Sequence, residues 1–112
     1  MNVRTQVLLW TAQRITAAVL ALCVVVHLVT IIYAVRHGLS AADILGRTHG
    51  SYAWLAFYAT FVAAVAIHAP IGVRTVLSEM FGFRGAPVDL ALLALGLMLA
   101  LWGGRAVLAV FG

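Results

Sequence analysis

Two histidines lie inside long apolar segments, and this placement is typical of cofactor ligands. His68 follows the apolar residues 61–67, and His27 follows the apolar residues 20–26. An imidazole in lipid is energetically costly unless it binds a metal, a hydrogen-bond partner or water, so histidines at such positions usually have a function. We therefore expect the chemistry of this chain to centre on His68, with His27 as a second site.

The residues one turn on either side of His68 are small. Ala64 precedes it by one helical turn and Gly72 follows it by one turn, while Phe57 and Phe61 lie further along the same helical face. A flat macrocycle ligated edge-on to a helix requires small residues at those two positions and accepts aromatic rings at its rim. His68 is thus predicted to ligate a haem iron through a neutral imidazole. The alternative is a histidine hydrogen-bonded to a neighbouring helix.

The depths of the two histidines differ. His68 precedes Arg74 by six residues, about 9 Å along a helix, whereas His27 lies about 20 Å beyond Arg14. A separation of roughly 10 Å or more prevents both from ligating one iron. If both are ligands, they serve two haems, and each iron needs a second axial ligand from another chain. A six-coordinate iron suits electron transfer rather than oxygen chemistry. For His27, a hydrogen bond to a partner helix is an equally good interpretation.

The composition predicts an integral membrane protein. Of the 112 residues, 65% are hydrophobic and 9% are charged, against roughly 25% charged in a soluble domain. Three apolar segments, at residues 7–33, 52–73 and 88–110, exceed the ~20 residues that a membrane-spanning helix needs. We therefore expect an all-α membrane protein with three transmembrane helices in one domain, residues 1–112, within a larger multi-subunit bundle. It is too small and apolar to hold a soluble catalytic domain as well.

The charged residues predict the orientation of the chain. All seven basic residues are arginines, and the net charge is +4. More arginines fall at the N-terminus and in the second connection (residues 77–86) than in the first connection (residues 36–50), which favours a cytoplasmic N-terminus. The sequence has no stripe of basic residues with interleaved aromatic residues, which is the pattern that would indicate nucleic-acid binding.

Two short motifs resemble the cytochrome b membrane-anchor subunit of succinate dehydrogenase and fumarate reductase. His68, Gly72, Val73 and Arg74 resemble the family's signature of a histidine, three residues, a glycine, an isoleucine or valine, and an arginine. Residues 13–16 resemble the motif that opens the family's first span, with Gln13 in place of its histidine and Ala17 in place of its glycine.

This resemblance implies a haem b-binding anchor subunit of succinate:quinone oxidoreductase with no catalytic residues of its own. Its partners would be a flavoprotein, an iron–sulfur subunit and a second small anchor subunit, in a bacterial or archaeal inner membrane. His68 would be the axial ligand of the proximal haem. Arg14, Gln13 and Trp10 would contribute to a quinone site, and Arg74, His49 and Arg105 are the residues expected near haem propionates.

The presence of His27 leaves the number of haems open. Single-haem members of this family usually lack a histidine here, whereas two-haem anchors have one near the outer end of the first span, where it ligates the distal haem. The resemblance therefore implies one or two haems shared with a partner chain. The alternatives are a small b-type cytochrome subunit of another dehydrogenase or hydrogenase, and a haem-free transporter or scaffold. No carboxylate lies in the middle of any span, which disfavours a transporter.

Overall fold

The computed structural model describes residues 2–112, which form helices and short connections. The helices are α1 (Val3–His37), α2 (Ala41–Thr48), α3 (Tyr52–Phe81) and α4 (Ala86–Phe111). By length and composition α1, α3 and α4 can each cross a membrane. The all-α fold with three membrane-spanning helices is therefore confirmed.

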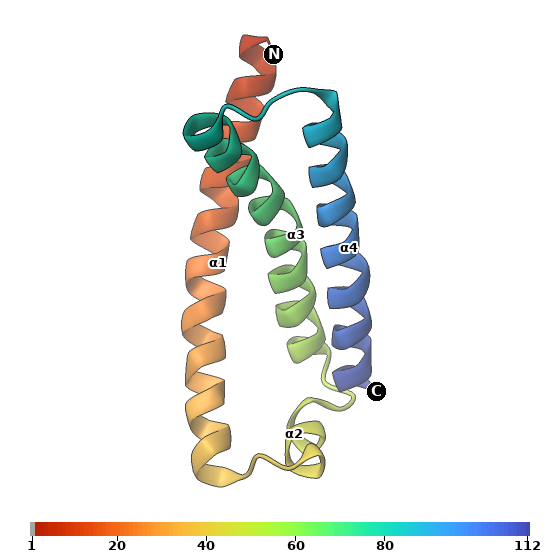
Figure 1. Ribbon diagram of the computed structural model, residues 1–112. Coiled ribbons are helices and arrows are strands. Elements are labelled where there is room, and N and C mark those ends of the chain that lie inside the picture. The colour runs from red at the N-terminus through yellow and green to blue at the C-terminus, as the bar shows by residue number, and fades with distance from the viewer. Residues whose placement is uncertain (1) are drawn as a thin grey trace.

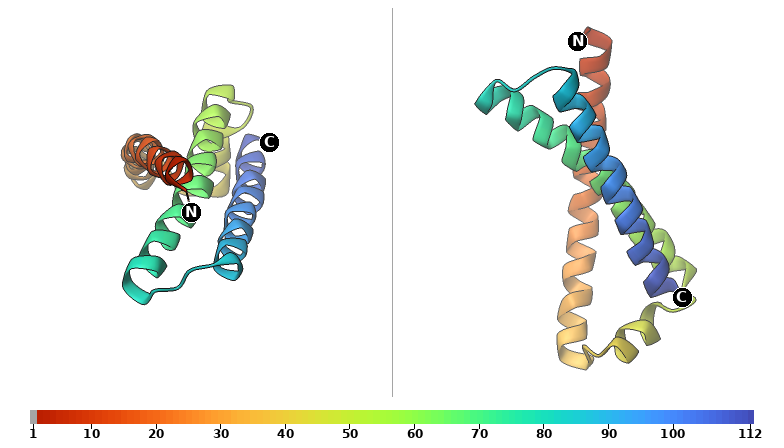
Figure 2. Two further views of the ribbon diagram at one scale, coloured as in Figure 1. Left: turned by 90° about the horizontal axis from the view of Figure 1, so that it is seen from above. Right: turned by 45° about the vertical axis from the view of Figure 1, so that its right-hand side comes forward.

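Helix α3 lies in the middle of the molecule. It packs on α1 along one side and on α4 along the other, and consecutive long helices run in opposite directions (Figure 1). The two termini consequently lie at opposite ends. Helix α1 leans away from α4 toward its C-terminal end, and α2 spans the opening that this leaves (Figure 2).

Two glycines of α4 bring it close to α3. A Cβ atom on Gly103 would lie 2.6 Å from a methyl carbon of Val62, and one on Gly96 would lie 3.0 Å from the carbonyl oxygen of Ala66. Gly96 and Gly103 are seven residues apart, so both face α3. Small residues at such positions allow the dispersion contacts that hold helices together in lipid.

The short helix α2 was not predicted from the sequence. Ser40 caps it by accepting a hydrogen bond from the Asp43 amide at 3.1 Å, and the Ser40 hydroxyl donates to the Asp43 carboxylate at 2.6 Å. This second bond lowers the pKa of Asp43. Such reciprocal capping stabilises the first turn of a helix. The spacing of Ser40 and Asp43 is the signal from which this helix could have been predicted.

The second connection is shorter than predicted. Residues 77–81, assigned to the loop from the sequence, continue α3 until Gly82, which ends the helix with a φ of 69°. A glycine in the left-handed region is a common helix terminator because it has no Cβ to clash. Helix α4 begins at Ala86, two residues before the predicted span, with Pro87 and Asp89 in its first turn.

Few side chains are buried within the chain. In the part that the structure describes, the buried apolar residues are Cys23, Ala64, Leu92 and Val107. Most other large apolar side chains face outward, as expected for helices whose surroundings are lipid or other subunits. Cys23, the one cysteine of the sequence, is buried as a free thiol.

Candidate functional site

His68 projects from α3 toward α1, where it meets a buried hydroxyl. Its Nδ1 lies 3.1 Å from Oγ1 of Thr16, a residue of α1 that is 7% exposed. The same hydroxyl lies 2.7 Å from the carbonyl oxygen of Ala12, one turn earlier on α1. The sequence-based alternative for His68, a hydrogen bond to a neighbouring helix, is thus present at Nδ1. It does not use the second ring nitrogen.

The second ring nitrogen of His68, Nε2, makes no hydrogen bond within residues 2–112. His68 also borders an open groove of about 350 Å³ along α3, whose lining is entirely apolar. The other lining residues are Ala69, Gly72, Val73, Val76 and Leu77. One nitrogen therefore has a partner within the chain, and the other has none among the residues that the structure describes.

The small residues flanking His68 have different surroundings. Ala64 is buried, at 5% exposure. Gly72 borders the groove, and a Cβ atom there would lie 3.2 Å from the side-chain nitrogen of Gln13. Gly72 thus makes room for the Gln13 amide as well as for the groove. The Oε1 atom of Gln13 is buried without a hydrogen-bond partner.

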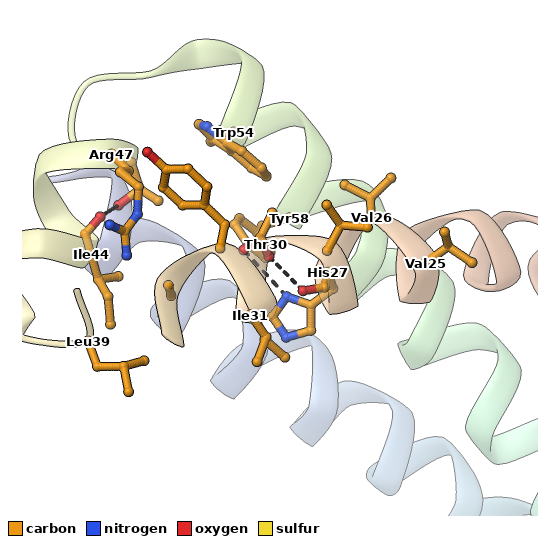
Figure 3. A pocket seen from close by; sticks show the side chains of 14 residues that line it. Val25, Val26, His27, Thr30, Ile31, Leu39, Ile44, Arg47, Trp54 and Tyr58 are labelled. Atoms are coloured by element: carbon orange, nitrogen blue, oxygen red, sulfur yellow. Dashed lines mark hydrogen bonds between the residues drawn. The ribbon is translucent and has the colours of Figure 1, made fainter. Parts of the chain in front are cut away.

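His27 lies at the other end of the α1–α3 interface. Its ring makes edge-to-face contacts with Tyr58 and Phe61, at centroid separations of 5.8 and 5.6 Å, and its Nδ1 is 3.5 Å from the Tyr58 hydroxyl. It lines a pocket of about 790 Å³ between α1, α2 and the start of α3, shown in Figure 3. This pocket is mostly apolar, is partly open to the surroundings and has room for a large ligand.

Arg47 of α2 brings a positive charge to the His27 pocket (Figure 3). Its guanidinium donates to the carbonyl oxygen of Gly38 at 2.9 Å and lies 5.4 Å from the ring centroid of Tyr33. Arg47 was not expected as a site residue, because its position beside the same pocket as His27 depends on the fold of α2.

The antiparallel pairing of α1 and α3 sets the depths of the two histidines. Thr16 meets His68, and His27 meets Tyr58 ten residues earlier on α3. Ten helical residues correspond to about 15 Å, so the two imidazoles lie too far apart to ligate one metal ion. Among residues 2–112, no three histidine, cysteine, aspartate or glutamate side chains form a metal-binding cluster.

The three residues predicted for a quinone site fall into two groups. Arg14 and Trp10 are both exposed on α1, with the guanidinium 5.4 Å from the Trp10 ring centroid. Gln13 instead packs against Gly72 of α3. Within the described part of the chain, Arg14 has no carboxylate partner, since the one salt bridge there joins Arg74 and Asp89.

The three residues predicted near haem propionates are widely separated. The Arg74 Nε donates to the Asp89 carboxylate at 2.9 Å, which ties α3 to the start of α4. His49 packs against Gly112 at the end of the chain, and Arg105 is exposed on α4. Neither His49 nor Arg105 lines the His27 pocket.

Comparison with known proteins identifies the family. Residues 1–105 match the family described as the succinate dehydrogenase/fumarate reductase transmembrane subunit. The chain belongs to this family. The match confirms the resemblance drawn from the two short motifs, and it extends through most of α4. No curated protein and no solved structure matches the chain.

Membership of the succinate dehydrogenase/fumarate reductase transmembrane-subunit family agrees with the three apolar helices, and it identifies an integral membrane protein. It also sets the chain apart from small transporters and from the b-type cytochromes of other dehydrogenases. The exposed apolar surfaces of α1 and α4 agree with membership of a family of subunits.

Proposed function

We propose that this chain is the haem b-binding membrane anchor of a succinate:quinone oxidoreductase. It would hold the flavoprotein and iron–sulfur subunits at the membrane and form part of the quinone site. Family membership supports the assignment to this complex. The observation that carries the cofactor assignment is the unpartnered Nε2 of His68 beside an apolar groove.

The residues around His68 fit haem b. A neutral imidazole with one nitrogen hydrogen-bonded and the other unpartnered is the usual arrangement of a metal-ligating histidine. The small residues Ala69 and Gly72 leave the groove open, and its apolar lining matches a macrocycle. Haem b would be held here by His68 together with a residue of another anchor subunit, and it would supply a reversible one-electron carrier.

The His27 pocket fits a second haem. It combines an imidazole, three aromatic residues and the guanidinium of Arg47, which is positively charged and suited to an anionic group. His27 would ligate the distal haem, and the ~15 Å offset from His68 makes the two sites separate. We propose that Arg47, rather than His49 or Arg105, lies nearest to any propionate in this pocket.

Arg14 and Trp10 are proposed to contribute to quinone binding. Their exposure on α1, near its N-terminal end, leaves them accessible to a partner subunit and to a quinone between the two. A guanidinium polarises a quinone carbonyl and stabilises negative charge on it. The N-terminal end would then face the cytoplasm of a bacterial or archaeal cell, in agreement with the arginine distribution.

A reduced-minus-oxidised spectrum of the purified complex tests the cofactor assignment, with haem b quantified per covalent flavin. We expect two haems per flavin in the unmodified complex, one in His27→Ala, and loss of the proximal haem in His68→Ala. His37→Ala is the matched control, because His37 stacks on Tyr33 at the surface and should leave the haem content unchanged.

Each outcome decides a different part of the proposal. One haem that survives His27→Ala but not His68→Ala would make His27 a structural residue that contacts Tyr58. A complex that contains no haem, or one that keeps all its haem in His68→Ala, would contradict the proposed role of His68.

A further inference from the structure

Thr16 has a specific position in this fold. Its hydroxyl is buried in the α1–α3 interface and is the group that meets the imidazole of His68. Other threonines of the long helices, such as Thr11 and Thr60, bond only to a carbonyl one turn earlier on their own helix. Thr16 makes that bond as well, so its hydroxyl contacts both a backbone carbonyl of α1 and the imidazole of His68.

Counting hydrogens fixes the direction of the bond to His68. A threonine hydroxyl has one hydrogen to donate and two lone pairs. The carbonyl oxygen of Ala12 can only accept, and it lies 2.7 Å from Oγ1, closer than the 3.1 Å to Nδ1 of His68. The shorter distance favours a hydrogen that points to Ala12. In that arrangement Nδ1 is the donor and Oγ1 the acceptor.

This direction determines the tautomer of His68. In a neutral imidazole, one nitrogen carries the proton and the other carries the lone pair. With the proton on Nδ1 and bonded to Thr16, the lone pair lies on Nε2. The bond also restrains rotation of the ring, since Thr16 is held in turn by the backbone of α1.

We infer that Thr16 is a positioning residue for the haem ligand: its hydroxyl accepts a hydrogen bond from Nδ1–H of His68, which orients the ring and leaves the lone pair of Nε2 for the iron. This inference rests on the proposed role of His68. An imidazole that donates a hydrogen bond gives more electron density to iron and favours the ferric state, so Thr16 would lower the midpoint potential of a haem held by His68. Loss of such a second-shell partner typically weakens metal binding by about 10- to 100-fold.

The test compares Thr16→Val with Thr11→Val in the purified complex. Valine has nearly the shape of threonine but has no hydroxyl. Thr11 is the matched control because it lies on the same helix and donates to the Val7 carbonyl at 2.8 Å, but is exposed and contacts no histidine. We expect Thr16→Val to raise the midpoint potential of the proximal haem and to weaken its retention about tenfold or more. Thr11→Val should change neither quantity, and Thr16→Ser should restore both.

A potential and a haem retention in Thr16→Val equal to those of Thr11→Val would overturn the inference. A serine variant that behaves like the valine variant would also overturn it, because the effect would then come from packing. Thr16→Ala serves as the second hydroxyl-free variant if Thr16→Val does not assemble, with the same expectations. Retention of the proximal haem in His68→Ala would instead contradict the proposed function, so the two failures are distinguishable.

Discussion

At the scale of single residues, the structure gives Arg74 a partner that was not expected from the sequence. Its guanidinium is bonded to Asp89 of α4, and both side chains are partly exposed, at 33% and 52%. An exposed ion pair of this kind contributes about 0–1 kcal/mol. The pair therefore adds little to stability, although it joins α3 to the start of α4.

Asp89→Asn separates an ion-pair role of Arg74 from contact with a haem propionate. If Arg74 acts through Asp89, Asp89→Asn and Arg74→Gln should each lower thermal stability slightly, with haem content unchanged. Thermal unfolding of the complex and the haem-to-flavin ratio are the two measurements. Loss of haem in Arg74→Gln alone would assign the residue to a propionate instead.

Arg14 is a second residue with a testable role. Arg14→Ala should reduce succinate-dependent quinone reduction by about tenfold or more, because a guanidinium that stabilises negative charge on a carbonyl oxygen is lost. Reduction of a soluble electron acceptor by the same complex should be unaffected. Arg36→Ala, at the opposite end of α1, is the control for the loss of one surface charge. Equal rates of quinone reduction in the unmodified complex, Arg14→Ala and Arg36→Ala would contradict a role for Arg14.

The positions of His27 and His68 at two depths could be predicted from the sequence, because both depend on counting along a helix. The residues that face them could not. Contact between His68 and Thr16 depends on the register of α1 against α3, which no local pattern specifies. For the same reason, Arg47 was not expected beside His27, whereas His49 and Arg105 were expected near a propionate and do not line that pocket.

At the scale of helices, Gly103 and Gly104 provide a matched pair. A methyl group at Gly103 would collide with Val62 of α3, whereas nothing lies within 4 Å of one at Gly104. Gly103→Ala should lower stability by about 1–3 kcal/mol through overpacking. Gly104→Ala should be neutral or slightly stabilising, since alanine favours a helix more than glycine does. Thermal unfolding checks both, and Val62→Ala should rescue Gly103→Ala. Equal stability of the two glycine variants would contradict close α3–α4 packing.

Helix α2 is attached to the end of α4 by two hydrogen bonds. The Thr48 hydroxyl donates to the Val110 carbonyl at 2.8 Å, and the Gly50 amide donates to the Phe111 carbonyl at 2.7 Å. These bonds satisfy carbonyl groups that would otherwise be unpaired at a helix end.

Thr48→Val should therefore lower stability by about 1 kcal/mol, because Thr48 is buried and the Val110 carbonyl would lose its donor. Thr48→Ser should be close to the unmodified chain in thermal unfolding. A valine variant as stable as the serine variant would argue that this contact does not hold α2 in place.

The three long helices were predictable because their apolar runs exceed the membrane thickness. Helix α2 was missed because eight residues give too few turns for a hydrophobic pattern to stand out from a polar loop. The end of α3 was placed too early because residues 77–81 include Ser78 and Glu79, which suggest a loop, although the helix continues to Gly82.

At the scale of the whole molecule, the antiparallel arrangement places the two termini on opposite sides of the membrane. With a cytoplasmic N-terminus, a fluorescent-protein fusion at the N-terminus should be fluorescent, and an alkaline phosphatase fusion at the C-terminus should be active. The reverse pattern would contradict the orientation proposed from the arginines. It would also place Arg14 on the side of the membrane away from cytoplasmic subunits.

The sparse burial of side chains within this chain has a consequence for its production in the cell. With four buried apolar residues among residues 2–112 and α1 in contact mainly with α3, the isolated chain has little internal packing to resist local opening. Binding of other subunits to the native form adds stability by mass action. We therefore expect molecules synthesised in excess over their partners to be degraded. The amount of this chain in the membrane should then follow the supply of the scarcest partner subunit rather than its own rate of synthesis.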